Sequence, residues 1–250
     1  MMNTPTRFTF YGDLLGIGAA YRLSSNVAYD KLDAFYNTVF NRFGSLCDRP
    51  ASPIKVHMFS DSVVMWGEDV AETLEQLQLV YLDLIEKNLL LRGVLVDGAL
   101  QREPRVEVTN FAKFLPIDNT LARAVGLEKT VKGARLLVES QLAHKLLSTH
   151  PEWLTIEGYI EHLNPNVPMC SPLRRICPSP SGMTYELLYF WRQNPAPTQA
   201  ATGNERVAER LKELAEFQDT SVARHLLETL KVLKRSEMRR RRTERGLLGA

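Results

Sequence analysis

The sequence contains 250 residues, of which 44% are hydrophobic and 24% are charged. These values are typical of a globular protein with one good-sized domain plus an appendage, or with two small domains. The net charge of +2 is unevenly distributed, because residues 203–250 hold 12 Lys and Arg against 8 Asp and Glu. No stretch approaches the ~18 apolar residues of a membrane span, and the N-terminus lacks an apolar run of signal-peptide length. We therefore expect a soluble cytoplasmic protein.

The three cysteines, Cys47, Cys170 and Cys177, form no pattern. An odd number at wide spacing argues against a disulfide framework and favours a reducing compartment. The spacing of Cys170 and Cys177 is not that of a zinc knuckle, so we expect no zinc site there.

The first half of the chain alternates between strand-like and helix-like patterns. A polar–aromatic alternation predicts a first strand that ends at Gly12-Asp13. Only Ser60-Asp61 separates two later strand-like runs, which is the length of a tight hairpin turn. The predicted elements are a strand over 7–11, a helix over 29–43, strands over 55–59 and 62–66, a helix from 70 to about 90, and a strand over 92–96.

The second half predicts a helix over 119–132, a strand over 135–138 and a hydrophobic strand over 185–191. Five prolines between 163 and 180 impose loop or extended structure. Residues 195–203 have the composition of a linker, and residues 204–245 form an amphipathic helix with a basic end. The expected organisation is a globular part over 1–194, a linker over 195–203 and a helical C-terminal extension over 204–250. The order of elements favours an α+β sandwich built on a split βαβ, ferredoxin-like arrangement.

Asp13 is the first candidate for chemistry. It follows an aromatic strand and precedes small residues, which leaves room for a metal ion or a phosphate near the backbone. The alternative is an aspartate that caps the next helix. A dinucleotide-binding fingerprint at Gly16 and Gly18 fails, because Tyr21 stands where the third glycine is needed.

Asp61 is the second candidate, and it lies in the predicted hairpin turn. Aspartates are common in turns for structural reasons alone. The hairpin can, however, lie beside the first strand, and two carboxylates that converge there could hold two divalent ions ~3.5–4 Å apart. Oxygen ligands and a phosphate-bearing substrate suit Mg²⁺ or Mn²⁺.

Asn119 and Arg123 form the third candidate pair, because residues four apart share one helix face. A guanidinium can stabilise charge that develops on a phosphoryl oxygen, and an amide can orient a ribose. The alternative is an ordinary exposed helix face.

Together these segments resemble the class III nucleotidyl cyclase domain. The resemblance rests on F-Y-G-D-L-L-G, F-S-D-S-V, R-G-V-L-V-D-G, N-T-L-A-R and G-A-R-L-L-V-E-S, which follow in consistent order between Phe8 and Ser140. The R-A-x-x-L-E segment from Arg123 to Glu128, and a late P-L-R-R-I-C-P…M-T-Y-E-L-L-Y-F-W stretch, resemble more specifically the bacterial Pycsar pyrimidine cyclases.

The resemblance implies a site and a reaction. Asp13 and Asp61 would be metal ligands, with the Leu14 carbonyl as a third, and the cofactors would be two Mn²⁺ or Mg²⁺ ions. Asn119 and Arg123 would contact the ribose and the transition state from a second protomer, so the active form would be a head-to-tail homodimer. The reaction would convert UTP to 3′,5′-cyclic UMP and pyrophosphate. The cyclic product would signal to a separate effector protein in anti-phage defence.

The departures from the family concern the base. Adenylyl cyclases place a Lys four residues before the second metal aspartate, where this chain has His57. Their adenine-reading Asp falls seven residues before the Asn, where this chain has Ala112. Both features disfavour ATP and make His57 and Ala112 the substrate-binding candidates. A histidine can hydrogen-bond a pyrimidine, which leaves CTP and cyclic CMP open, and it can equally be a structural residue.

Two further interpretations stay open. Another two-metal phosphoryl transferase on a palm-like core would also use a pair of aspartates. A cyclase fold without activity could serve as a nucleotide sensor. The basic end from Lys234 to Arg245 could bind nucleic acid, although cations at a helix C-terminus and the absence of interleaved aromatics favour a solvated helix end.

Overall fold

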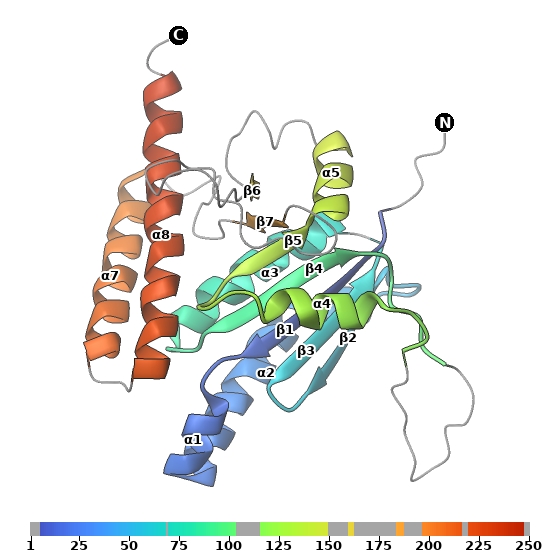
Figure 1. Ribbon diagram of the computed structural model, residues 1–250, viewed down its shortest axis with the longest axis horizontal. Coiled ribbons are helices and arrows are strands. Elements are labelled where there is room, and N and C mark those ends of the chain that lie inside the picture. Colours follow the sequence, from blue (N-terminus) through green and yellow to red (C-terminus); the bar gives the residue numbers. More distant parts are fainter. Residues whose placement is uncertain are drawn as a thin grey trace.

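A mixed sheet of seven strands forms the centre of the computed structural model (Figure 1). The structure describes residues 6–68, 70–103, 116–149, 160–162, 184–187, 197–216 and 220–247. Its strands are β1 (Phe8–Leu14), β2 (Ile54–Phe59), β3 (Ser62–Gly67), β4 (Leu91–Asp97), β5 (Leu136–Glu139), β6 (Ile160–His162) and β7 (Thr184–Leu187). Its helices are α1 (Ile17–Leu23), α2 (Ser25–Cys47), α3 (Val70–Glu86), α4 (Thr120–Glu128), α5 (Ser140–Thr149), α7 (Pro197–Glu216) and α8 (Thr220–Leu247).

The strands lie in the order β2-β3-β1-β4-β5-β7-β6. All neighbouring pairs are antiparallel except β4 and β5, which are parallel and are connected through α4. A parallel pair needs such a crossover, because a tight turn can join only antiparallel strands. The expected α+β sandwich is therefore confirmed.

The two faces of the sheet are covered by different helices. Along β1, Phe8, Phe10 and Leu14 point into the larger core, which α2 and α3 complete. Tyr11 and Asp13 alternate with these residues and therefore lie on the opposite face. That face carries α4, whose Ala124 and Leu127 pack on β4 and β5 in a smaller cluster. Figure 1 shows α4 on one side of the sheet with α2 and α3 on the other.

Gly93 on β4 allows the aromatic core to close against the sheet. A Cβ atom on Gly93 would lie 2.6 Å from Cζ of Phe10 and 2.9 Å from the hydroxyl oxygen of Tyr81. Both separations are shorter than a carbon atom tolerates, so a larger residue here would push Phe10 away from its place under β1.

Several element boundaries differ from the sequence-based expectations. The first strand extends to Leu14, so Asp13 lies inside it, because its pairing with β3 and β4 continues past the glycine at 12. Helix α4 ends at Glu128 rather than at residue 132, and Asn119 is its N-cap residue. The linker predicted over 195–203 is wrong in part, since α7 begins at Pro197. Proline is favoured at a first helical position, and the good helix formers Gln199, Ala200 and Ala201 lie in the turn that follows.

The C-terminal helices α7 and α8 pack on each other as an antiparallel pair, which stands beside the sheet (Figure 1). Leu226, Leu230 and Leu233 of α8 are buried in the larger core. Thr229 accepts a hydrogen bond from the Ala134 amide at 2.8 Å, just before β5. The predicted helix over 204–245 is thus two helices, and the second is part of the core.

Among the described residues, no helix combines the length and the apolar character that crossing a membrane requires. The proline-rich segment between 163 and 180 lies outside the described residues, as does the part of the predicted strand 185–191 beyond Leu187.

Candidate active site

Asp13 lies on β1 opposite Ser62, the first residue of β3. The Ser62 hydroxyl donates a hydrogen bond to Oδ1 of Asp13 at 3.2 Å, and it also lies 3.3 Å from the hydroxyl of Tyr11. Tyr11 and Asp13 are two residues apart on one strand, so their side chains share a face. The strand pairing therefore fixes the direction of the Asp13 carboxylate.

Asp61 lies in the turn that joins β2 to β3. Its neighbour Ser60 has a φ of 52°, a left-handed conformation that a two-residue hairpin turn requires. The backbone carbonyl of Asp61 accepts a hydrogen bond from the Leu14 amide at 2.7 Å. This bond ties the tip of the hairpin to the end of β1, and it brings the two aspartates to the same place on the molecule.

The electrostatics of Asp13 reflect this proximity. Partial burial, then the negative charge of Asp61 and then that of Glu128 raise the pKa of Asp13 to about 6. The hydrogen bond from Ser62 and the charge of Arg92 act in the opposite direction without cancelling the increase. A site that holds two carboxylates together against their repulsion is suited to a bound cation.

The residues present fit a divalent metal site of limited protein ligation. In the described ranges, no group of three or more His, Cys, Asp or Glu side chains could surround an ion. Two carboxylates supplemented by a backbone oxygen, such as that of Leu14, leave several positions for the phosphate oxygens of a substrate. Mg²⁺ and Mn²⁺ commonly bind in this way.

Arg92 and Glu128 lie beside the two aspartates, although the sequence alone predicts no role for them. Arg92 is the β4 residue opposite Asp13, and its Nε donates to the carboxylate of Glu128 at the end of α4. Both side chains are buried. The signal was present, since each residue falls within a segment that carries the family resemblance, but only folding places them beside the aspartates.

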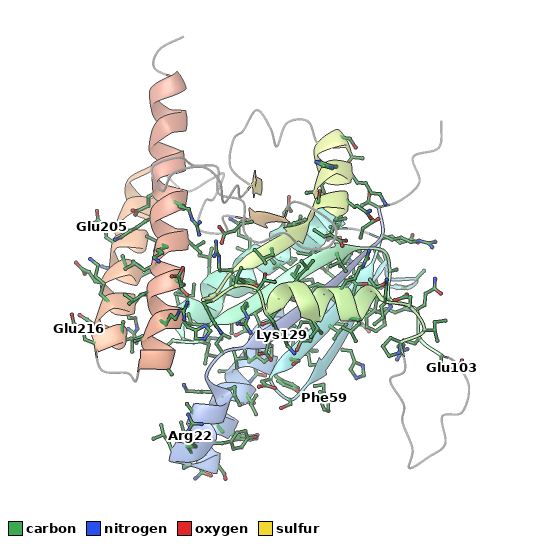
Figure 2. All side chains as sticks on the ribbon, in the orientation of Figure 1. Arg22, Phe59, Glu103, Lys129, Glu205 and Glu216 are labelled. Carbon is green, nitrogen blue, oxygen red and sulfur yellow. The ribbon has the colours of Figure 1, made fainter. Side chains whose placement is uncertain are left out.

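His57 lies on β2 opposite Val64, which in turn lies opposite Tyr11 on β1. Directly opposed residues point to the same face, so His57 shares the face of Tyr11 and Asp13. His57 is exposed, as is Phe59, which Figure 2 shows at the end of the hairpin. The other base-reading candidate, Ala112, lies outside the described residues.

Arg123 lies at the other end of the sheet. Its Nη2 donates to the Asp97 carbonyl at 2.5 Å, and its Nη1 lies 3.6 Å from Oε1 of the buried Glu139. The Asp97 amide donates to the second oxygen of Glu139 at 2.9 Å, so one carboxylate links both groups. Asn119 is exposed at the start of α4.

The register of β1 and β4 separates the two halves of the predicted site. Asp13 pairs with Arg92, whereas Asp97 pairs with Phe8, five residues earlier on β1. At about 3.4 Å per residue, the two ends are about 17 Å apart. Within one chain, the structure therefore brings together Asp13 and Asp61 but leaves Asn119 and Arg123 at the opposite end.

Comparison with known proteins identifies the class of fold. No protein-family model and no curated protein matches the sequence. Two solved structures of adenylate cyclases from Trypanosoma brucei in their monomeric state are similar to the chain. One has a TM-score of 0.53 at 12% identity, covering 74% of this chain and 90% of that one. The other has a TM-score of 0.52 at 14% identity, covering 77% and 92%. The chain therefore has the fold of class III nucleotidyl cyclase domains.

Proposed function

We propose that this protein is a nucleotidyl cyclase that converts a nucleoside triphosphate to its 3′,5′-cyclic monophosphate and pyrophosphate. The observation that carries the proposal is the pair Asp13 and Asp61, held together at one end of a sheet with the cyclase fold. Burial, and then the charge of Asp61, raise the pKa of Asp13, and a carboxylate in this situation is suited to a cationic ligand.

In this reaction, Asp13, Asp61 and the Leu14 carbonyl would hold two divalent ions, Mn²⁺ or Mg²⁺. Such ions supply the positive charge that binds a triphosphate and acidifies an attacking hydroxyl. Ser62 holds Asp13 in position through its hydrogen bond. The ribose 3′-oxygen attacks the α-phosphorus, its proton is lost, and the bond to the pyrophosphate oxygen breaks.

The proposed active form is a head-to-tail homodimer. Arg123 is bonded to Asp97, whose position on β4 is about 17 Å from that of Asp13 along the sheet. Arg123 is therefore directed away from the phosphates that Asp13 and Asp61 would bind. A second copy in the reverse orientation would bring its Asn119 to the ribose and its Arg123 to the charge that develops on the α-phosphate. Each dimer would then contain two equivalent sites.

We further propose that the substrate is a pyrimidine nucleotide, with UTP favoured and CTP as the alternative. His57 replaces the lysine and Ala112 the aspartate that read adenine in the resembled adenylyl cyclases. His57 lies on the same sheet face as Asp13, and it can hydrogen-bond a pyrimidine oxygen or ring nitrogen. The cyclic product would act on a separate effector in anti-phage defence, as the Pycsar resemblance implies.

The direct test is incubation of the purified protein with each of ATP, GTP, CTP and UTP in the presence of Mn²⁺. We expect cyclic UMP and pyrophosphate in equal amounts from UTP, and no product from the Asp61→Ala variant. Formation of cyclic CMP alone would change the nucleotide but keep the reaction. If no triphosphate gives a cyclic product, the proposed activity is wrong.

A further inference from the structure

Arg92 and Asp13 are close neighbours with opposite charges. They occupy directly opposite positions on the antiparallel strands β4 and β1. Side chains at such positions lie on the same face, with Cβ atoms about 4.5–5.5 Å apart. An arginine at that distance from a carboxylate ordinarily forms an ion pair with it, often through two hydrogen bonds.

Arg92 makes its bonds elsewhere. Its Nε donates to Glu128, and its Nη1 donates to the Val131 carbonyl at 3.0 Å. In the described part of the chain, the Asp13 carboxylate accepts its side-chain hydrogen bond from Ser62 and none from Arg92. The guanidinium is thus held at the end of α4 and turned away from the strand position opposite it.

The two possible partners of Arg92 differ in burial. Glu128 is 2% exposed, whereas Asp13 is only partly buried. A carboxylate buried without a cation is strongly destabilising, so Glu128 needs Arg92 more than Asp13 does. Because a buried ion pair stabilises a fold little in comparison with apolar residues, its presence calls for another explanation.

We propose that Glu128 holds Arg92 away from Asp13, so that both aspartates of the site stay available to a divalent cation. Glu128 and Arg92 are then positioning residues and do not contact the metal. The inference rests on the metal site of the proposed function, but not on the reaction at that site. It also assigns the two ends of α4 to different tasks, because Arg123 near its start faces Asp97 and Glu139.

Glu128→Gln tests this inference, because it preserves the shape of the side chain and removes its charge. Arg92 is then expected to pair with Asp13 and to compete with the metal. The double variant Glu128→Gln/Arg92→Met removes the competitor as well. The control is Glu186→Gln, which neutralises a second buried carboxylate on β7, three strands across the sheet from β1. Glu186 pairs with Arg135, just before β5, and with Arg235 of α8.

The measurement is Mn²⁺ binding to the full chain without nucleotide, followed by the electron paramagnetic resonance signal of free Mn²⁺, with circular dichroism to verify folding. We expect the dissociation constant to rise about tenfold or more in Glu128→Gln, given the strength of a charge pair at this distance. It should return to within about threefold of wild type in the double variant and stay unchanged in Glu186→Gln.

Two results with the variants would overturn the inference. In the first, Glu128→Gln binds Mn²⁺ as wild type does. In the second, the double variant binds as weakly as the single one, which would make Glu128 itself a ligand. If Glu128→Gln does not fold, the double variant is the test: the inference requires it to bind Mn²⁺ as tightly as wild type.

A wild-type protein that binds Mn²⁺ but forms no cyclic product would refute the proposed reaction while leaving this inference intact. A wild-type protein that does not bind Mn²⁺ would refute the metal site and the inference together.

Discussion

At the scale of single residues, the candidate site holds negative charge that destabilises the fold and is available to a ligand. Asp13 is partly buried on a central strand, beside a second aspartate and near a third carboxylate, Glu128. The nearest arginine is bonded to Glu128 rather than to Asp13. Uncompensated charge of this kind destabilises a fold, and proteins retain it where a ligand needs it.

The first prediction is that Asp13→Asn raises the melting temperature of the metal-free protein. Burial and the charge of Asp61 raise the pKa of Asp13 to about 6, so the folded state disfavours its ionised form. Above pH 6 the wild type carries this penalty and the variant does not, and we expect a gain of about 2–4 °C at pH 8. The gain should shrink as the pH falls through 6 towards 4, because Asp13 becomes protonated in the folded state.

Differential scanning calorimetry in EDTA at several pH values measures this effect. Addition of Mn²⁺ should raise the melting temperature of wild type and leave that of Asp13→Asn nearly unchanged. A variant that melts below wild type at pH 8 would show that the Asp13 charge is compensated in a way that the geometry does not include.

The second prediction concerns the choice of base. His57→Lys combined with Ala112→Asp places the two adenine-reading residue types of the resembled adenylyl cyclases in this chain. We expect the ratio of kcat/KM for ATP to that for UTP to rise at least about tenfold, because each lost or gained hydrogen bond to a base is worth a kcal/mol or more. Steady-state kinetics with both triphosphates measure the ratio. An unchanged ratio would remove His57 from base recognition.

At the scale of elements, α4 bonds to residues at both ends of β4. Near its start, Arg123 is bonded to Asp97 and faces Glu139, at the end of β4 away from Asp13. At its end, Glu128 is bonded to Arg92, the β4 residue opposite Asp13. The intervening Ala124 and Leu127 pack on the sheet and keep the helix at a constant position between these two points.

The third prediction follows from the contact between Arg123 and Glu139. In the described residues, Nε of Arg123 and Oε1 of Glu139 are buried without hydrogen-bond partners, so the carboxylate orients the guanidinium chiefly by charge. We expect Glu139→Gln to lower kcat by about ten- to a hundredfold through misplacement of Arg123. Mn²⁺ binding should not change, since Asp13 lies at the other end of the sheet.

Mixing two inactive variants distinguishes a role for Glu139 in catalysis from simple loss of stability, because only the former gives recovery of activity with a particular partner. Glu139→Gln should regain activity when mixed with Asp61→Ala, whose chains carry an intact Glu139 and Arg123. It should not regain activity when mixed with Arg123→Ala. If activity recovers with both variants, or with neither, Glu139 does not act through Arg123.

The fourth prediction concerns α8. Leu226, Leu230 and Leu233 lie in the same core as β1, and each buried leucine contributes about 1.5–3 kcal/mol. Deletion of residues 217–250 should therefore remove a large part of the ~5–15 kcal/mol that stabilises a domain. Deletion of residues 238–250 spares these leucines and Arg235, which pairs with Glu186 at 3.0 Å.

Urea unfolding of the two truncated chains compares them directly. The longer deletion should abolish the cooperative transition, and the shorter one should leave the midpoint close to that of the full chain. The shorter chain is also the suitable protein for testing whether the basic end binds nucleic acid, because its core is intact. Similar unfolding of both truncated chains would show that α8 is dispensable for the fold.

At the scale of the whole molecule, the sequence predicts the features that depend on neighbouring residues, and it does not predict contacts between distant ones. The hairpin with Asp61 in its turn follows from the two-residue spacing, and the α+β order follows from the alternation of hydrophobic periods. The pair Arg92 and Glu128 was not predicted, because the two residues are 36 positions apart and only the sheet brings them together. The packing of α8 was missed for the same reason, since its apolar face predicts a helix but not the surface it covers.

The central claim also concerns the whole molecule: the active site is formed by residues from two copies of the chain. Equal mixing of Asp61→Ala with Arg123→Ala, each inactive alone, tests this claim most directly. Half of the dimers formed at random contain one chain of each kind, and each of these has one intact site of two. We predict cyclase activity with UTP and Mn²⁺ at about one quarter of the wild-type level after mixing. A mixture that stays inactive, although the two variants exchange subunits, would contradict the claim.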